Sequence, residues 1–195
     1  MKLILASKSP RRKKILSKLG IPFDIIHPNV DEKIISSKLL PDQYSIQTAK
    51  LKCDAISNIK PNCLVIGADT IVVLDDLIIG KPKNKLDAKR ILQSLSGRNH
   101  QVYTGVYFKL ISKKISYGFY EKTNVKFHTL NKNEIDLYIR KNKPFDKAGS
   151  YGIQDLSAIF VESINGCYDN VVGFPLSTFY KECNLLNINL LDSIS

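Results

Sequence analysis

The chain has no long apolar run, and it contains few arginines, histidines and cysteines. A helix that crosses a bilayer needs about 20 consecutive apolar residues, and no segment of the sequence approaches that length. The apolar run at residues 3–6 is also too short for the hydrophobic core of a signal peptide. We therefore expect a cytoplasmic protein without a membrane partner.

The four cysteines and three histidines are scattered along the chain. No two cysteines form a Cys-x-x-Cys pair, so the sequence indicates neither a structural zinc site nor a disulfide framework. No Ser-His-Asp set can be argued from the spacing of the histidines. Any chemistry must therefore rest on carboxylates and lysines, with or without a metal ion.

Arginine is scarce although the chain is basic. Only five of the 29 Lys and Arg residues are Arg, and the formal net charge is +11. Such a charge is typical of nucleic-acid-binding proteins, but the lysines are spread evenly, and the abundance of Lys, Ile and Asn is typical of A/T-rich codons. We expect no nucleic-acid partner and keep a non-catalytic, basic nucleic-acid-binding protein as the alternative.

The composition, 44% hydrophobic and 24% charged, predicts one globular domain over residues 1–195. Strands are predicted at 3–6, 23–27, 64–66, 71–74, 77–79, 101–111, 115–129 and 159–164. Helices are predicted at 10–19, 41–58, 85–95, 131–141 and 175–186, with loops at 146–154 and 166–170. Helices alternate with strands early and a long hairpin follows, so we expect a mixed α/β fold. In the helix at 41–58, five residues are predicted to face the core: Tyr44, Ile46, Ala49, Leu51 and Ala55.

The first predicted strand leads directly into the start of a helix. Ser9 is a favourable N-cap and Pro10 suits the first helical position, while Gly20 suits the residue that ends the helix. Free backbone N–H groups, the hydroxyl of Ser7 and the adjacent Arg11 and Arg12 would suit a phosphate here. The alternative is a capped surface helix with a basic start.

Asp69 is the strongest single candidate for chemistry. It follows the apolar residues 64–66 across Gly67 and Ala68, two small residues that allow a ligand to approach the backbone. A carboxylate at the carboxyl end of a buried strand can bind a divalent cation or take a proton from water. It can equally cap the backbone of a turn.

Other polar residues are weaker candidates. Glu32 lies in a loop and is either a second carboxylate near a metal or a solvated acid. Lys52 and Lys81 can each meet phosphate oxygens or lie on the surface. In the Gly-rich loop at 146–154, Gln154 can contact the edge of a base and Tyr151 can stack on one. The alternative is an ordered loop with a buried amide.

Taken together, the chain resembles the Maf family of nucleoside triphosphate pyrophosphatases over nearly its whole length. The matching segments are Ser7-Lys8-Ser9-Pro10-Arg11-Arg12, Gly67-Ala68-Asp69-Thr70, Gly80-Lys81-Pro82, Leu95-Ser96-Gly97, residues 146–154 and Val172-Gly173-Phe174-Pro175-Leu176. The resemblance implies cleavage of a nucleoside triphosphate to the monophosphate and pyrophosphate, with Mg²⁺ or Mn²⁺. It also implies an elongated mixed sheet flanked by helices, related to the inosine triphosphatase fold, and often a homodimer.

The resemblance also implies a substrate. Arg11, Thr70 and Gln154 agree with the family branch that acts on dTTP and UTP, and disagree with the branch associated with 7-methyl-GTP. These three residues are expected to select the nucleotide, and modified pyrimidine triphosphates are also possible substrates. One departure is Phe174, where Leu is common, and we interpret it as a packing change.

The same resemblance implies a role for each remaining candidate. Asp69 is expected to activate water, or to bind the metal together with Glu32, and the sequence does not decide between these roles. Five residues are expected to hold the phosphates: Ser7, Ser9, Arg12, Lys52 and Lys81. The family is also linked to cell-division arrest, so a regulatory role is a further alternative.

Overall fold

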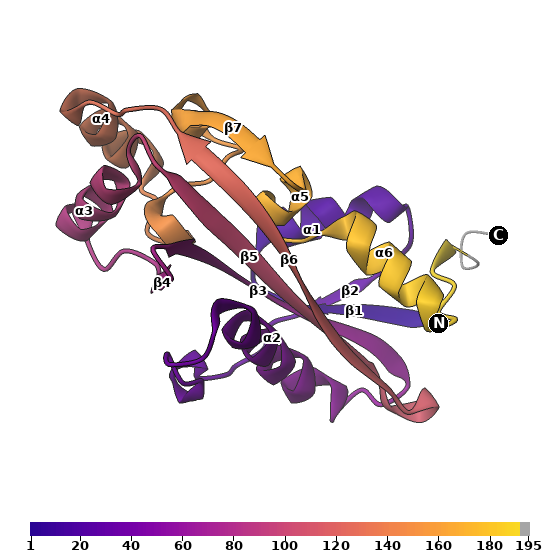
Figure 1. The fold of residues 1–195 in the computed structure, drawn as a ribbon. Helices are drawn as coiled ribbons and strands as arrows, with labels where there is room; N and C mark the ends of the chain where they lie inside the picture. Colours follow the sequence, from indigo (N-terminus) through magenta and orange to yellow (C-terminus); the bar gives the residue numbers. More distant parts are fainter. Residues whose placement is uncertain (192–195) are drawn as a thin grey trace.

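The computed structural model describes residues 1–191, so the last four residues of the predicted domain lie outside the described residues. One seven-stranded sheet organises the fold (Figure 1). Its strands are β1 (Lys2–Ala6), β2 (Asp24–Ile26), β3 (Cys63–Leu74), β4 (Leu77–Ile79), β5 (Asn99–Leu110), β6 (Ile115–Phe127) and β7 (Val161–Asn165).

The sheet is mixed, as predicted. β1 pairs in parallel with β2 and β3, whereas β3, β5, β6 and β7 follow one another in antiparallel order. The three longest strands, β3, β5 and β6, run the length of the molecule and give it an elongated shape (Figure 1). The predicted hairpin is formed by β5 and β6.

Within residues 1–191, six α-helices flank the sheet: α1 (Pro10–Leu16), α2 (Pro41–Ser57), α3 (Lys85–Leu95), α4 (Lys132–Asn142), α5 (Tyr168–Val172) and α6 (Leu176–Leu185). Short 3₁₀ helices lie at Ser17–Leu19, Glu32–Ile34, Ile111–Lys113, Ala148–Ser150 and Leu156–Phe160. The predicted caps are confirmed: Ser9 caps α1, Asn131 caps α4, and Gly20 adopts a left-handed conformation with φ of 71°. No helix within residues 1–191 is long and apolar enough to cross a membrane.

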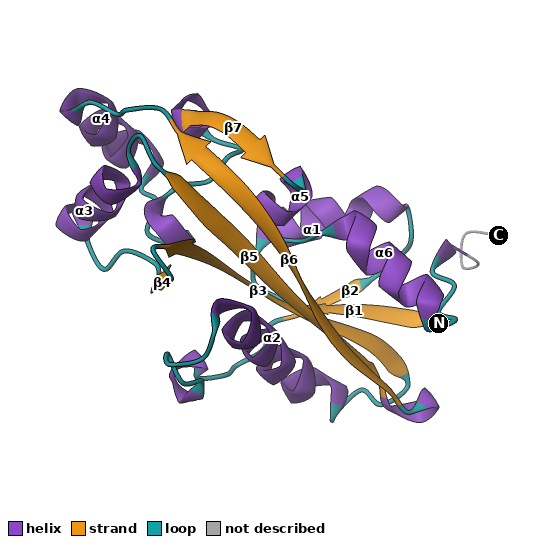
Figure 2. Ribbon diagram, in the orientation of Figure 1, coloured by secondary structure: helices purple, strands orange, loops and turns teal. Residues whose placement is uncertain are grey.

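The two faces of the sheet are covered differently, because successive side chains of a strand point to opposite faces. On β3, Leu64 and Ile66 pack with α1 and α6, and Val72 packs with α3 and α4. Val65 points the other way and packs with Cys53 and Ile56 of α2. Among the described residues, α2 is the only α-helix on its face of the sheet, and the 3₁₀ helix at Glu32–Ile34 lies beside it (Figure 2).

Of the five residues predicted to face the core from α2, only Ala49 is fully buried, and the other four are half-buried. The buried residues of this helix are Ser45, Thr48, Ala49, Lys52, Cys53, Ile56 and Ser57. A methyl group on Gly67 would lie 2.2 Å from the backbone oxygen of Ala49, and one on Gly105 would lie 2.3 Å from a backbone carbon of Ser45. The helix approaches the sheet so closely that small and polar residues, not large apolar ones, fill the contact.

Three further predictions fail at element boundaries. Residues 63–74 form one continuous strand, because β3 pairs with β5 from Val65 to Val73 across the predicted interruption. The last strand begins at Val161, since residues 156–160 form a 3₁₀ helix. The predicted loop at 166–170 contains the start of α5, a helix too short to show apolar periodicity.

Candidate active site

A break in the pairing along one edge of β3 creates the main pocket. β1 pairs with β3 only as far as Gly67, and β4 pairs with it only from Val72. Between them, residues 68–71 have no strand partner on this edge among the described residues. A cavity of about 340 Å³ lies here, lined by both faces of the strand. That volume lies within the ~300–1,000 Å³ typical of small-molecule sites.

All ten predicted site residues line this one pocket. They are Ser7, Ser9, Arg11, Arg12, Glu32, Lys52, Asp69, Thr70, Lys81 and Gln154. They come from α1, α2, β3, the 3₁₀ helix at Glu32–Ile34 and three loops, which are far apart in the sequence. The structure therefore brings together every residue that the sequence singled out for a role in the site.

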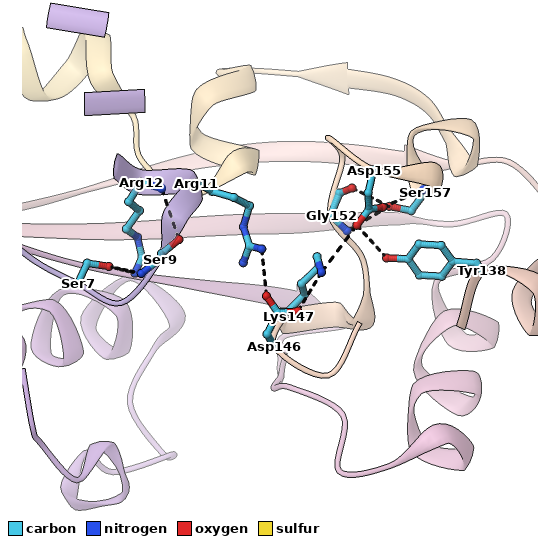
Figure 3. Close-up of polar contacts among 10 residues, drawn as sticks. All are labelled: Ser7, Ser9, Arg11, Arg12, Tyr138, Asp146, Lys147, Gly152, Asp155 and Ser157. Carbon is cyan, nitrogen blue, oxygen red and sulfur yellow. Dashed lines mark hydrogen bonds and ion pairs between the residues drawn. The ribbon is translucent and has the colours of Figure 1, made fainter. Parts of the chain in front are cut away.

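The start of α1 forms one wall of the pocket. The Oγ of Ser9 accepts a hydrogen bond from the backbone N–H of Arg12, and the Oγ of Ser7 accepts one from the backbone N–H of Ser9 at 3.1 Å (Figure 3). Pro10 occupies the first helical position. The two hydroxyls thus hold the turn that presents the helix N-terminus and its arginines to the pocket.

Asp69, Lys52 and Glu32 meet on the α2 side of β3. The Lys52 ammonium lies 2.6 Å from Oδ1 of Asp69 and 3.0 Å from Oε1 of Glu32. Asp69 and Lys52 are both buried. Asp69 stands in the middle of β3 and not in a turn, so the interpretation as a turn cap is wrong. One ammonium shared by two carboxylates offsets much of the cost of burying these charges.

The shared ammonium also affects proton binding in the pocket. Burial acts to raise the pKa of Glu32, but the charge and hydrogen bond of Lys52, aided by Lys81 and Arg12, lower that pKa below its ordinary value. The pKa of Tyr44 on α2 is raised by burial and then by the negative charges of Asp69 and Glu32. The pocket thus favours an ionised Glu32 beside its cations.

Arg12 and Thr70 meet on the opposite side of β3. The Nε of Arg12 donates to the backbone oxygen of Gly173 at 2.8 Å, and its Nη2 donates to Oγ1 of Thr70 at 2.9 Å. Oγ1 of Thr70 also lies 2.9 Å from Oγ1 of Thr104 on β5. Burial lowers the pKa of Arg12, and the nearby carboxylate of Asp69 opposes that shift.

The loop at 146–154 closes the far side of the pocket. Gly149 and Ser150 have positive φ angles of 66° and 61°, which bend the loop back toward the sheet. Tyr151 is buried, its ring packs edge-on against Phe127, and its hydroxyl lies 2.8 Å from Nε2 of His100. Gln154 stays exposed at the pocket. The loop is therefore held by the core and leaves the amide of Gln154 available to a ligand.

An exposed ion pair joins α1 to this loop. Nη1 of Arg11 lies 3.1 Å from Oδ2 of Asp146, and Lys147 lies 2.9 Å from Asp146 and 3.7 Å from Asp155 (Figure 3). Sequence reasoning singled out neither Asp146 nor Thr104 by itself. No local sequence pattern indicates Thr104, because its contact with the pocket is through Thr70, which lies 34 positions away in the chain.

The residues of the pocket fit a divalent cation only in part. Within residues 1–191, no group of three or more His, Cys, Asp or Glu side chains comes together as a metal site. Asp69 and Glu32 nevertheless bring two carboxylates to one cationic group, the ammonium of Lys52. Mg²⁺ commonly uses one or two carboxylates and completes its shell with water and phosphate oxygens. The two carboxylates fit a cation that arrives with a phosphate ligand.

Comparisons with known proteins give one family over nearly the whole chain. The family model described as "Maf-like protein" matches residues 2–186. A protein of Bacillus anthracis named dTTP/UTP pyrophosphatase is 46% identical over 189 residues, which cover 97% of each chain. A protein of Bacillus cereus with the same name has the same identity and coverage.

Solved structures match less closely. The Ham1 protein of Staphylococcus aureus is 14% identical, with a TM-score of 0.47, over 65% of this chain and 72% of the other. A similarity of this extent carries no information about function.

Proposed function

Because the chain belongs to the Maf family, we propose that it is a nucleoside triphosphate pyrophosphatase that hydrolyses dTTP and UTP to the monophosphate and pyrophosphate. The observation that carries this proposal is the pocket at the break in β3. It places the paired carboxylates of Asp69 and Glu32 opposite the N-terminus of α1, where anions bind favourably. The names of the Bacillus relatives support the choice of dTTP and UTP.

In this proposal the triphosphate binds between the two sides of the pocket. Ser7, Ser9 and the N-terminus of α1 hold phosphate oxygens, while Arg12 supplies a fixed positive charge. Lys52 and Lys81 add charge from α2 and from the loop after β4. The three cations neutralise the phosphates that an attacking water must approach.

Asp69 is the proposed acceptor of a proton from water. The oxygen of that water attacks the α-phosphorus, its proton passes to the carboxylate, and the bond from the α-phosphorus to the bridging oxygen breaks, so that pyrophosphate leaves. Lys52 contacts Oδ1 of Asp69, and we assign the proton to Oδ2. The two oxygens of one carboxylate can thereby divide cation binding and proton transfer between them.

A divalent cation, Mg²⁺ or Mn²⁺, would be held by Asp69 and Glu32. When bound, it would neutralise phosphate charge and make a bound water more acidic. Lys52 lies between these same carboxylates, and its charge and hydrogen bond lower the pKa of Glu32. Choice of metal is tested by loading the protein with each ion separately.

Nucleotide selection is assigned to Arg11, Thr70 and Gln154. All three side chains line the pocket, and Gln154 has an amide that can both donate to and accept from the edge of a pyrimidine. Modified pyrimidine triphosphates belong to the same substrate class, and their removal would clean the nucleotide pool.

We further propose that the protein is a single-domain, cytoplasmic homodimer, on the basis of its family. Light scattering during size-exclusion chromatography tests the dimer, since it measures molar mass directly. A mass of one 22.0 kDa chain would overturn that part of the proposal.

The decisive experiment is a screen for pyrophosphate release from nucleoside triphosphates, with Mg²⁺, with Mn²⁺ and with chelator. We expect dTTP and UTP to be the best canonical substrates and chelator to abolish turnover. Faster cleavage of 7-methyl-GTP would contradict the choice of nucleotide. Salt-sensitive DNA binding without any pyrophosphate release would favour the nucleic-acid alternative.

A further inference from the structure

A directed chain of hydrogen bonds runs from the pocket into the core on the α1 side of β3. Nη2 of Arg12 lies 2.9 Å from Oγ1 of Thr70, which lies 2.9 Å from Oγ1 of Thr104, which lies 3.1 Å from the backbone oxygen of Asn170. Thr104 and Asn170 are fully buried. Thr70 and Thr104 are direct partners on β3 and β5, and Asn170 belongs to α5, which packs against β5 (Figure 1).

The chemistry of the two ends fixes the direction of every hydrogen bond in this chain. Arg12 can only donate, so Thr70 accepts at that end. The backbone oxygen of Asn170 can only accept, so the single hydroxyl hydrogen of Thr104 is used there. Thr104 then has only lone pairs to offer to Thr70. Thr70 must therefore give its own hydrogen to Thr104, at a shorter distance than its 3.4 Å contact with Gly173.

The position of α5 makes this direction stable. The side-chain amide of Asn170 donates to the backbone oxygen of Val102 at 3.1 Å and to Oγ1 of Thr123 at 2.9 Å. Thr123 in turn accepts from the backbone N–H of Cys167. These bonds tie α5 to both β5 and β6, so the backbone oxygen of Asn170 stays in place as the acceptor for the hydroxyl of Thr104.

We propose that Thr104 is a positioning residue that orders the hydroxyl of Thr70, so that Thr70 presents only a hydrogen-bond acceptor to the substrate. The proposal rests on the pyrophosphatase function proposed above and deepens it, because it defines which nucleotides the site admits. An ordered acceptor favours a group that donates a hydrogen. dTTP and UTP share two such groups, the imide N3–H of the base and the 3′-hydroxyl of the sugar.

Cytosine differs from uracil at that position. Its N3 carries a lone pair and no hydrogen, so it would face the lone pair of Thr70. A polar group left without a partner in this way lowers affinity strongly, and sites built around one hydrogen bond discriminate well between such analogues. With the imide as partner, the site rejects CTP; with the 3′-hydroxyl as partner, it admits CTP and rejects 3′-deoxy nucleotides.

The test measures kcat and KM for UTP, CTP, dTTP and 3′-deoxy-TTP in the wild type, T104V and T104S. Valine has nearly the shape of threonine but no hydroxyl. With the imide as partner, we expect T104V to reduce the preference for UTP over CTP by at least about tenfold, mainly through KM, because the freed Thr70 can then also donate. With the 3′-hydroxyl as partner, we expect the same reduction in the preference for dTTP over 3′-deoxy-TTP. T104S keeps the hydroxyl, and we expect it to retain the preference.

A matched control separates positioning from simple loss of stability. Thr48 is equally buried, on α2, and its hydroxyl donates to the backbone oxygen of Tyr44, so it takes no part in the chain of bonds through Thr70 and Thr104. T48V should therefore lower the melting temperature without changing the nucleotide preference. A double-mutant cycle completes the test: in a T70V background, T104V should change the preference no further.

Several outcomes would overturn the inference. These are folded T104V with neither the UTP-over-CTP preference nor the dTTP-over-3′-deoxy-TTP preference changed, equal changes in T104V and T48V, or additive effects in the cycle. If T104V does not fold, the wild type still decides, because equal kcat/KM for UTP, CTP and N3-methyl-UTP, with 3′-deoxy-TTP cleaved like dTTP, would exclude both donating groups. A wild type without activity on dTTP and UTP would instead contradict the proposed function.

Discussion

The two faces of β3 at the pocket each hold a positively charged side chain, but the partners of that side chain differ. On the α2 side, Lys52 lies between two carboxylates, and all three charged groups meet within hydrogen-bond distance. On the α1 side, the guanidinium of Arg12 is held by neutral partners, the hydroxyl of Thr70 and the backbone oxygen of Gly173. The cation of the first side is therefore shared between two acids, whereas the cation of the second side is held by a backbone oxygen and a hydroxyl.

This difference suggests a division of labour between neighbouring residues of one strand. Asp69 and Thr70 are adjacent in sequence, but a strand points successive side chains to opposite faces. The break in pairing at residues 68–71 exposes both faces to one cavity. The proposed function therefore assigns proton transfer and nucleotide selection to adjacent residues that point to opposite faces of β3.

The largest expected effect comes from removing the charge of Asp69. D69N keeps the shape of the side chain but removes the proposed proton acceptor, and loss of such a group typically lowers the rate by about 10²–10⁴-fold. Single-turnover release of pyrophosphate measures it. D75N is the control, since Asp75 lies in the exposed turn after β3 and pairs with Arg98. Wild-type turnover by folded D69N would refute the proposed role.

Replacing Lys52 should alter both rate and pH dependence. K52M removes the ammonium that lowers the pKa of Glu32, so that pKa should rise and the acid limb of kcat/KM should move to higher pH. We expect a rate loss of about 100-fold, comparable with loss of one stabilising donor. K50M is the matched control, because Lys50 lies on the same helix and pairs with Asp54.

The same variant makes a prediction about stability. A lowered carboxylate pKa stabilises the fold above its unfolded-state pKa, and this stabilisation is lost as pH falls through the folded-state pKa. In urea unfolding, the free energy of unfolding of the wild type should therefore fall as the pH is lowered. K52M should show a smaller fall, because the contribution of Glu32 is missing. Identical pH dependence in the two proteins would show that Lys52 does not control this carboxylate.

The close approach of α2 to the sheet can be broken without touching a charged residue. G105A would place a methyl group 2.3 Å from the backbone of Ser45, so the helix must shift, and we expect destabilisation of about 1–3 kcal/mol. Because Lys52 lies on this helix, turnover should fall as well. In G80A the added methyl group meets open space, and thermal unfolding should show little change.

The smallest effect is expected at the exposed ion pair across the pocket. Arg11 and Asp146 have side chains that are 28% and 60% exposed, and such pairs contribute about 0–1 kcal/mol. D146N should therefore leave the melting temperature nearly unchanged and alter KM for dTTP only a few-fold. D136N, which removes the surface partner of Lys89, is the control. A large loss of activity would place Asp146 in the binding machinery.

Local sequence predicted most elements but not their packing. Caps at Ser9 and Asn131 were predictable because each depends on a few adjacent residues. The inner face of α2 was not, because contact with Gly67 and Gly105 replaces apolar burial with close backbone packing. The continuity of β3 through residues 67–70 was also hidden, since pairing with β5 outweighs the weak strand preference of those residues.

The sequence alone determined the family, the mixed fold and the set of residues gathered in the pocket, because motif order and local periodicity are written along one chain. Only the tertiary structure placed Lys52 between Asp69 and Glu32, and Thr104 next to Thr70 on the neighbouring strand. Those contacts join residues that are at least 17 positions apart. They depend on strand register and on how near a helix approaches the sheet, which no local pattern encodes.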